Sequence, residues 1–272
     1  MLEVSQLGKT YGEGENATHA IGSISFGIEE KEFVCVVGPS GCGKTTLLKC
    51  MSGLLEPSTG STALKGRTVD GPPPEMALVF QEYSRSLLPW MSVRGNVTLP
   101  LRHKKLGKGE TARLVEEAVE AVGLTGFIDR YPWELSGGMQ QRVAIARALA
   151  YQPEILLMDE PFASVDAQTR GDLEDLVLRV HEEFGITILF VTHDIDESVY
   201  LSHRIVVLTH APTVVKEIVG VDLPTPRDQL ETKELPEFAH LRAYVYRLIK
   251  RDRSAPSGVD APSTLVGEGL LD

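Results

Sequence analysis

Residues 38–45 combine glycines, a lysine and a threonine in the pattern G-x-x-x-x-G-K-[ST], which is typical of a loop that binds phosphate groups. The pattern lies between an apolar run and a helical pattern, where backbone N–H groups and a helix dipole face an anion. Lys44 is placed to reach the outer phosphates, and the Thr45 hydroxyl can ligate Mg²⁺. This context disfavours the alternative, a glycine-rich turn that only caps a helix. The predicted phosphate-binding residues are Gly38, Pro39, Ser40, Gly41, Cys42, Gly43, Lys44, Thr45 and Thr46.

Two adjacent acids follow a second apolar run. Residues 155–158 read Ile-Leu-Leu-Met, and Asp159 and Glu160 come directly after them. A strand that is buried along its length exposes only its carboxyl end to a ligand crevice. Asp159 is therefore expected in the Mg²⁺ shell, and Glu160 is expected to polarise an attacking water. The alternative is a pair of surface acids at a strand end, which the phosphate loop in the same chain disfavours.

A hydroxyl and two glycines stand directly before a long helical pattern. Residues 135–142 read Leu-Ser-Gly-Gly-Met-Gln-Gln-Arg. Ser136, Gly137 and Gly138 are thus placed at a helix N-terminus, where backbone N–H groups and the helix dipole attract anions. The chain therefore holds two predicted phosphate cradles but one set of candidate catalytic acids.

Apolar runs rich in β-branched residues alternate with helical patterns, and together these elements must position the cradles. The predicted strands are residues 33–37, 77–80, 155–158, 187–191 and 205–208, and the predicted helices are residues 45–51, 141–150, 169–184 and 196–202. Such alternation predicts parallel strands joined by right-handed crossovers, with ligands at the carboxyl ends. Shorter alternating segments in residues 2–28 predict an antiparallel layer at the edge of the sheet.

The predicted fold class is α/β, a P-loop NTPase core with a mostly parallel sheet, an N-terminal antiparallel β layer and an inserted helical subdomain. The insert is indicated by Leu114, Ala118 and Val122, which share one helix face, and is placed at about residues 82–150. One further helix is predicted at residues 237–250. We therefore predict a single domain over residues 1–250. The composition of residues 251–272, dominated by Ser, Pro and Gly, predicts a flexible tail.

Charge and cysteine usage exclude several classes of protein. The 272 residues carry a net charge of −11, the wrong sign for general nucleic-acid binding. Cys35, Cys42 and Cys50 form no C-x-x-C, so neither a disulfide framework nor a thiolate zinc site is predicted, and a reducing, cytoplasmic setting fits. We interpret Cys42 as a small spacer, because loop backbone binds phosphate. We predict neither a membrane span, which needs about 20 apolar residues, nor a secretion signal.

The two cradles together resemble the nucleotide-binding subunit of ATP-binding cassette (ABC) transporters, whose signature element is Leu-Ser-Gly-Gly-x-Gln. Residues 135–140 match this signature, and the resemblance covers about residues 2–219. It implies that Gln140 joins Ser136, Gly137 and Gly138 in an element that closes over ATP held by the other subunit of a head-to-tail dimer. The cofactors implied by the resemblance are ATP and Mg²⁺.

The resemblance also assigns roles to single residues. Tyr11 resembles the aromatic residue that stacks on adenine, with a turn aromatic as the alternative. Gln81 resembles the glutamine that senses the metal and the attacking water, with an exposed loop residue as the alternative. His193 resembles the switch histidine that touches the γ-phosphate and holds the catalytic carboxylate, with a structural histidine as the alternative. The implied catalytic residues are Lys44, Gln81, Glu160 and His193, and the implied metal ligands are Thr45, Gln81 and Asp159.

Two segments resemble the family's contact surfaces. Residues 164–166, Ser-Val-Asp, resemble the short loop that contacts the partner subunit, with Val165 as a mild departure. Residues 87–93, Leu-Leu-Pro-Trp-Met-Ser-Val, resemble the segment that meets a cytoplasmic helix of the membrane subunit. The alternative for this run is that it forms the subdomain's own core. With the Phe-Gln-Glu lead-in and residues 238–244, the run is most like the ATPases of nitrate, sulfonate and taurine importers.

The resemblance implies an ATP hydrolase that powers a membrane importer for nitrate, sulfonate, taurine or a related small organic anion. Its location would be peripheral, at the cytoplasmic face of the inner membrane. The implied partners are a transmembrane permease subunit, a second ATPase subunit that is identical or closely homologous, indirectly an extracytoplasmic solute-binding protein, and no nucleic acid. The main alternative is a soluble ABC-type ATPase acting in translation or DNA repair. A small-molecule kinase with the same phosphate loop is disfavoured by the signature.

Overall fold

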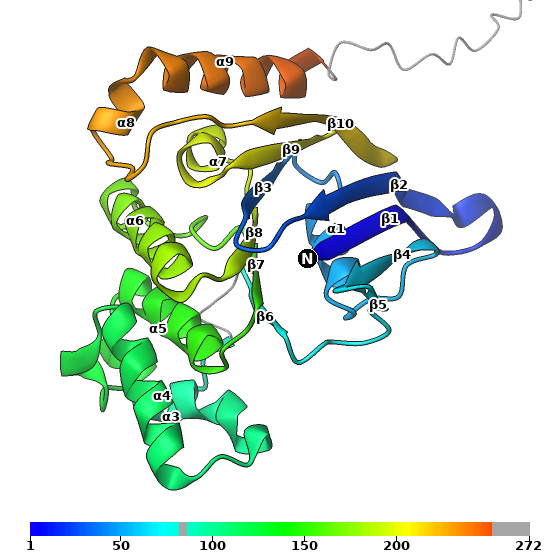
Figure 1. The fold of residues 1–272 in the computed structure, drawn as a ribbon. Helices are drawn as coiled ribbons and strands as arrows, with labels where there is room; N and C mark the ends of the chain where they lie inside the picture. The colour runs from blue at the N-terminus through cyan, green and yellow to red at the C-terminus, as the bar shows by residue number, and fades with distance from the viewer. Residues whose placement is uncertain (82–85, 252–272) are drawn as a thin grey trace, which may run out of the picture.

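One mixed sheet organises the molecule (Figure 1). The computed structural model describes residues 1–81 and 86–251. In this part of the chain the strand order is β5-β4-β1-β2-β10-β9-β3-β8-β7-β6. The strands are β1 (Leu2–Tyr11), β2 (Thr18–Ile28), β3 (Phe33–Val37), β4 (Thr59–Leu64), β5 (Arg67–Thr68), β6 (Met76–Val79), β7 (Ile155–Asp159), β8 (Thr187–Val191), β9 (Arg204–Leu208) and β10 (Thr213–Gly220).

Helices follow most of the central strands. Those described are α1 (Lys44–Met51), α3 (Val93–Thr98), α4 (Lys108–Ala121), α5 (Gly137–Ala150), α6 (Ala167–Phe184), α7 (Ile195–Leu201), α8 (Glu231–Glu234) and α9 (Pro236–Arg251). Short 3-10 helices are η1 (Gly14–Asn16), η2 (Leu99–Lys104), η3 (Thr125–Phe127) and η4 (Pro132–Glu134). Within the described ranges, no helix is both long enough and apolar enough to cross a bilayer.

Five neighbouring strands, β9-β3-β8-β7-β6, pair in parallel, as predicted. Every residue of β3, β7 and β8 is buried, which fits strands that are covered on both faces. β6 lies one residue earlier than predicted, and Phe80, 41% exposed, follows it. Because parallel strands end at the same edge, the residues after β3, β7 and β8 are brought together.

The other half of the sheet is antiparallel, as predicted for the N-terminal segment. β1 pairs with β2 on one side and with β4 on the other, and β5 continues the sheet beyond β4. β10 joins the two halves, since it pairs antiparallel with β9 and parallel with β2.

Side chains of β3 alternate between two apolar cores on opposite faces of the sheet. Phe33, Cys35 and Val37 lie in the core that includes residues of α3 to α7 and of α9. Val34 and Val36 lie in the core that includes α1 and the antiparallel strands. Because successive strand residues point to opposite faces, α1 and α5 cover opposite sides of the sheet. Figure 1 shows the same separation.

Between β6 and β7 the chain leaves the sheet and forms α3, α4 and α5. Leu114, Ala118 and Val122 are all buried, as their spacing predicts. α5 begins at Gly137, four residues before the predicted start, because the Ser136 hydroxyl caps the helix by accepting the Met139 N–H at 3.3 Å.

Residues 87–93 divide between the core and the surface. Leu87 and Val93 are buried, whereas the Trp90 side chain is 68% exposed. The segment therefore contributes to the core of the helical part and also presents an aromatic side chain to solvent. Gln81, the last residue described before this region, is exposed.

The C-terminal segment returns across the helices. α9 contributes Phe238 and Val245 to the core and lies beside α7, where Arg242 pairs with Asp196 at 3.6 Å. The predicted helix at residues 237–250 corresponds to α9. Residue 251, where the predicted tail begins, belongs to α9, and residues 252–272 lie outside the described residues.

Candidate nucleotide site

The loop between β3 and α1 has the backbone that its glycines predict. Gly41 and Gly43 have φ angles of +74° and +95°, in the left-handed region that favours glycine. Lys44 begins α1, and its ammonium donates to the carbonyl oxygens of Gly38 and Pro39 at 3.1 and 3.2 Å. These contacts hold the lysine side chain over its own loop. Its positive charge is therefore beside the place where the loop would bind an anion.

Cys42 lies in the same loop and is buried. Burial raises the pKa of its thiol, so the protonated form persists and is a poor nucleophile. Its carbonyl oxygen accepts a hydrogen bond from the Thr213 hydroxyl, which ties the loop to β10. These contacts give Cys42 a structural place in the loop, in keeping with a spacer.

Asp159 ends β7 beside the first turn of α1. Its Oδ1 accepts the Thr45 hydroxyl at 3.2 Å. Burial raises the pKa of this carboxyl, and the neighbouring charge of Glu160 acts in the same direction. A bound cation would offset both effects, and Mg²⁺ favours carboxylate and hydroxyl oxygens combined with substrate phosphates. Thr45 and Asp159 therefore fit a magnesium site that ATP would complete.

Glu160 connects the phosphate loop to the end of β8. Its Oε1 lies 3.7 Å from the Lys44 ammonium, and its Oε2 lies 2.8 Å from Nδ1 of His193. The backbone N–H of Glu160 donates to the Val191 carbonyl at 2.8 Å. Three of the predicted catalytic residues thus form one chain of contacts at the carboxyl edge of the sheet.

The backbone at Glu160 adopts an uncommon conformation. Its φ angle is +43°, in the left-handed region that costs a non-glycine residue about 1–2 kcal/mol. The bond to Val191 and the contacts to Lys44 and His193 hold the residue in place. A strained residue at the end of a buried strand is a feature of functional sites, and here it directs a carboxylate toward the phosphate loop.

The two remaining predicted residues on this side lie at its rim. The Tyr11 hydroxyl is 3.3 Å from the Thr46 hydroxyl, and 42% of Tyr11 is exposed. Gln81 follows β6, which pairs with the strand that ends in Asp159. Tyr11 therefore lies beside the loop helix, and Gln81 lies at the same sheet edge as the acids.

The signature residues lie elsewhere. In the described part of the chain, no hydrogen bond or ion pair joins Ser136, Gly137, Gly138 or Gln140 to the phosphate loop. They begin α5, on the face of the sheet opposite α1. The Gln140 side chain donates to the carbonyls of Pro132 and Leu135 at 3.0 and 3.2 Å. The structure thus brings the loop and the acids together but leaves the signature on a separate surface.

Gly138 packs closely against the helix that follows β7. A Cβ atom at this position would lie 2.4 Å from Cγ2 of Thr169 in α6. The Thr169 hydroxyl and backbone N–H both donate to Asp166, at 2.7 and 3.0 Å. A larger residue at position 138 would therefore have to displace the Thr169 side chain, next to the Ser164–Asp166 loop, so this glycine has a packing role within the chain beside its predicted contact with phosphate.

Sequence reasoning missed the contribution of α9 to the surroundings of the loop. A cavity of about 520 Å³ separates Pro39 and His193 from Tyr246, Ile249 and Lys250 of this helix. The helical pattern of residues 237–250 predicts α9 itself but carries no signal for the surface on which it packs.

Glu197 of α7 is a second residue that sequence reasoning missed. Its Oε2 accepts the Thr192 hydroxyl at 2.5 Å, and its Oε1 lies 3.5 Å from Nε of Arg170. Burial raises the pKa of Glu197 from the ordinary value of 4.5 to about 7, and the charges of Asp194 and Glu174 act in the same direction. The unfolded chain therefore loses this proton at lower pH than the folded chain does, so the contribution of Glu197 to stability falls as the pH rises from about 4.5 to 7.

Replacing Glu197 with Gln removes this titration. The free energy of unfolding of the wild type, measured relative to Glu197→Gln, is expected to fall by about 2 kcal/mol between pH 5 and pH 8. Urea titrations at the two pH values measure the difference. Glu116→Gln, on the surface of α4, is the matched control and should show no such change. A difference between wild type and Glu197→Gln that is the same at both pH values would contradict the assignment.

The chain matches known proteins over most of its length. The sequence pattern of the ABC transporter family matches residues 21–163, which is more than half of the chain. An uncharacterised ABC transporter ATP-binding protein of Methanocaldococcus jannaschii is 47% identical over 249 residues, covering 92% of this chain and 91% of the relative.

Two relatives of Synechococcus elongatus have named transport roles. The nitrate import ATP-binding protein NrtD is 40% identical and covers 92% of this chain and 93% of its own. The bicarbonate transport ATP-binding protein CmpD is also 40% identical, covering 89% of this chain and 88% of its own.

A solved dimeric ATP-binding cassette, in a post-hydrolysis state with ADP and Pi, matches the fold. Its TM-score is 0.70 at 31% identity, over 82% of this chain and 99% of that one. The fold class predicted from the sequence is therefore confirmed. With a phosphate loop, an adjoining pair of carboxylates and the family's sequence pattern over half its length, the chain belongs to the ABC transporter family and is one of its ATP-binding, ATP-hydrolysing subunits.

Proposed function

We propose that this chain powers an ABC importer for a small anion, as a peripheral subunit at the cytoplasmic face of the cell membrane. One observation carries the catalytic part of the proposal: Lys44, Glu160 and His193 form a chain of contacts at the phosphate loop, whereas Ser136 begins a helix on the opposite face of the sheet. A pocket that needs both elements takes them from two subunits.

In this mechanism the ATP phosphates bind the loop of one subunit, and Lys44 contacts the outer phosphates. Glu160 orients a water in line with the γ-phosphate, and His193 holds that carboxylate through its Nδ1 contact. The Ser136 and Gly138 backbone N–H groups of the second subunit stabilise charge on the γ-phosphate in the transition state. Tyr11 stacks on adenine at the open rim, where 42% of the residue is exposed.

The metal shell would be formed by Thr45 and Asp159, with Gln81 joining from the end of β6. Mg²⁺ bound there would neutralise charge on the β- and γ-phosphates. In the described residues, no group of three or more His, Cys, Asp or Glu side chains could hold a metal.

Residues 1–250 form the proposed ATPase domain, with about residues 82–150 as its helical subdomain, of which residues 82–85 lie outside the described residues. The proposed partners are a permease, a second ATPase subunit and, through the permease, a solute-binding protein. Relatives that are named for nitrate and bicarbonate transport support import of a small anion. The sulfonates and taurine that the sequence resemblance suggests stay candidates beside these two. None of the relatives described above supports a role in translation or DNA repair.

Trp90 is the residue that we propose for permease docking. Its side chain is 68% exposed, while Leu87 and Val93 on either side anchor the segment in the core. Tryptophan is enriched among the few interface residues whose truncation costs about 2 kcal/mol or more of binding free energy.

Affinity isolation of the tagged chain from detergent-solubilised native membranes tests this proposal. We expect a multispanning membrane protein to co-purify, and Trp90→Asp is expected to reduce its yield at least about tenfold, because the substitution places a charge in an apolar contact. Leu230→Asp is the matched control, because it places the same charge at an apolar residue that is 74% exposed and directly precedes α8. Equal yields with Trp90→Asp and wild type would count against the docking surface, and no membrane partner at all would count against the transport role.

A further inference from the structure

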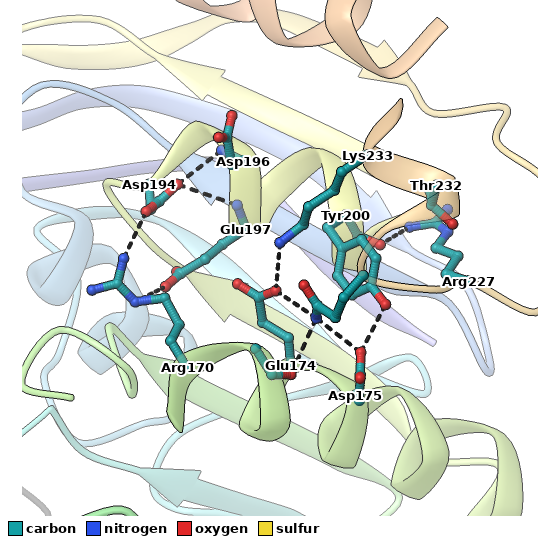
Figure 2. Close-up of polar contacts among 12 residues, drawn as sticks. Arg170, Glu174, Asp175, Asp194, Asp196, Glu197, Tyr200, Arg227, Thr232 and Lys233 are labelled. Carbon is teal, nitrogen blue, oxygen red and sulfur yellow. Dashed lines mark hydrogen bonds and ion pairs between the residues drawn. The ribbon is translucent and has the colours of Figure 1, made fainter. Parts of the chain in front are cut away.

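A polar network joins α6, α7 and residues 225–235, which we call the C-terminal strap (Figure 2). Its α6 members are Arg170, Glu174 and Asp175, spaced so that they share one side of the helix. Among the described residues, no hydrogen bond or ion pair joins this network to the phosphate loop, and the contacts of Lys44 and Glu160 described above do not include its members. Its two ends differ in the elements they join.

At the N-terminal end of α6, Arg170 bridges two functional segments. Its Nη1 donates to Oδ2 of Asp194 at 3.1 Å, and its Nε lies 3.5 Å from Oε1 of Glu197. Asp194 directly follows His193 and caps α7 by accepting the backbone N–H groups of residues 196 and 197. On its other side, Nη2 of Arg170 lies 3.5 Å from the carbonyl oxygen of Val165.

Val165 belongs to the Ser164–Asp166 loop, which lies at the surface beside the signature glycine. Ser164 and Asp166 are exposed. Asp166 caps α6 through Thr169, which is also the residue that packs against Gly138. A displacement of this loop would therefore move Arg170 in two ways: through the Val165 carbonyl oxygen and through the first turn of α6, which the loop precedes.

The C-terminal end of the network is fixed by the strap. Glu174, 2% exposed, accepts from Lys233 at 3.1 Å and from Gln229 at 2.9 Å. Asp175 accepts from Gln229 and from the Tyr200 hydroxyl of α7, at 2.8 and 2.7 Å. α6 is thus anchored to α7 and to the strap along its middle, as Figure 2 shows. Toward its N-terminus, α6 reaches the segment that follows His193 through Arg170, which contacts Asp194 and Glu197.

We infer that Arg170 is a positioning residue, which holds the backbone after His193 in register with the Ser164–Asp166 loop and so couples partner contact at that loop to the His193–Glu160 pair. This inference rests on the proposed function, because it assumes that the loop meets a second subunit. The geometry favours a guanidinium, since one planar group donates to Asp194, lies 3.5 Å from a Glu197 oxygen and lies 3.5 Å from the Val165 carbonyl oxygen. A lysine ammonium can make the contact to Asp194 or the contact to Val165 but not the full bridge.

Steady-state ATP hydrolysis by the purified full chain tests the inference. Arg170→Met should lower kcat about tenfold or more and leave KM for ATP within about threefold, because the phosphate loop is untouched while the catalytic pair is misplaced. The kcat of Arg170→Lys should lie between that of the wild type and that of Arg170→Met. The backbone amides of residues 192–197 should exchange their hydrogens faster in Arg170→Met than in the wild type.

Lys233→Met is the matched control, since it removes one positive charge from the same network at the fixed end. It should lower thermal stability and leave kcat near that of wild type. An equal loss of kcat in Lys233→Met and Arg170→Met would overturn the inference, because any loosening of α6 would then suffice. A wild-type kcat in Arg170→Met, or unchanged exchange in residues 192–197, would overturn it as well.

These outcomes are separable from a failure of the proposed function. The proposed head-to-tail pairing fails if the wild-type chain hydrolyses ATP under conditions in which light scattering shows that it stays monomeric with ATP and Mg²⁺. In that case the Arg170 comparison still reports whether this residue positions His193. If pairing holds and Arg170→Met behaves as wild type, only the inference about Arg170 is wrong.

Discussion

Glu160→Gln is expected to lower the rate of ATP hydrolysis at least a hundredfold while allowing ATP-bound dimers to accumulate. The amide keeps the shape of the side chain but loses the charge that orients and polarises the attacking water, and loss of a general base typically costs 10² to 10⁴ in rate. Since ATP is then not cleaved, the nucleotide that joins two subunits persists. Phosphate release and size-exclusion chromatography with ATP and Mg²⁺ measure the two effects.

Glu154→Gln is the matched control for this change. Glu154 precedes the other end of β7, where its half-exposed carboxylate pairs with Lys65. It should hydrolyse ATP as the wild type does and should show no lasting dimer. If Glu160→Gln remains monomeric with ATP and hydrolyses it at the wild-type rate, Glu160 is not the catalytic carboxylate.

Lys44→Ala is expected to weaken ATP binding at least about a hundredfold. The Lys44 side chain is 5% exposed, and its ammonium lies over the loop. A charged hydrogen bond contributes about 1.5–3 kcal/mol, so two phosphate contacts account for a change of this size. The substitution also leaves Glu160 without its cationic neighbour, 3.7 Å away, which adds repulsion toward the γ-phosphate. Titration with a fluorescent ATP analogue measures the affinity.

Lys49→Ala tests whether any lost charge on α1 has this effect. Lys49 lies on the exposed side of the same helix, in its last turn. The affinity of Lys49→Ala for ATP should stay within about threefold of that of the wild type, because a charge in solvent contributes little to binding. Equal losses in the two variants would show that Lys44 acts only through the general field of the helix.

The sequence predicts the parallel strands and the phosphate loop well, for a physical reason. β3 and β8 match their predicted bounds because buried parallel strands must be apolar throughout, which makes them distinct from the helices around them. Glycine at positions 41 and 43 signals the left-handed backbone that the loop adopts. The helical pattern predicts a helix only from residue 141, whereas Ser136, which the sequence already places at a helix N-terminus, marks the observed start of α5.

Contacts between distant elements could not be predicted in this way. Arg170 has the ordinary appearance of a helix surface residue, and its partner Asp194 lies 24 positions away. The raised pKa of Glu197 depends on burial under other elements, which local periodicity does not reveal. The cavity between Pro39 and Tyr246 likewise depends on where α9 lies in three dimensions. The site was thus predictable where motifs are local and was not predictable where tertiary packing creates the environment.

The position of α1 and α5 on opposite faces of one sheet has a consequence for energy use in the cell. Under the proposed mechanism, a single copy holds the nucleotide from one side only, and the groups that stabilise the departing phosphate come from a second subunit. ATP hydrolysis therefore depends on the pairing of two subunits. Subunits that are kept apart, for instance in a transporter without solute, would not hydrolyse ATP, and no separate inhibitor would be needed.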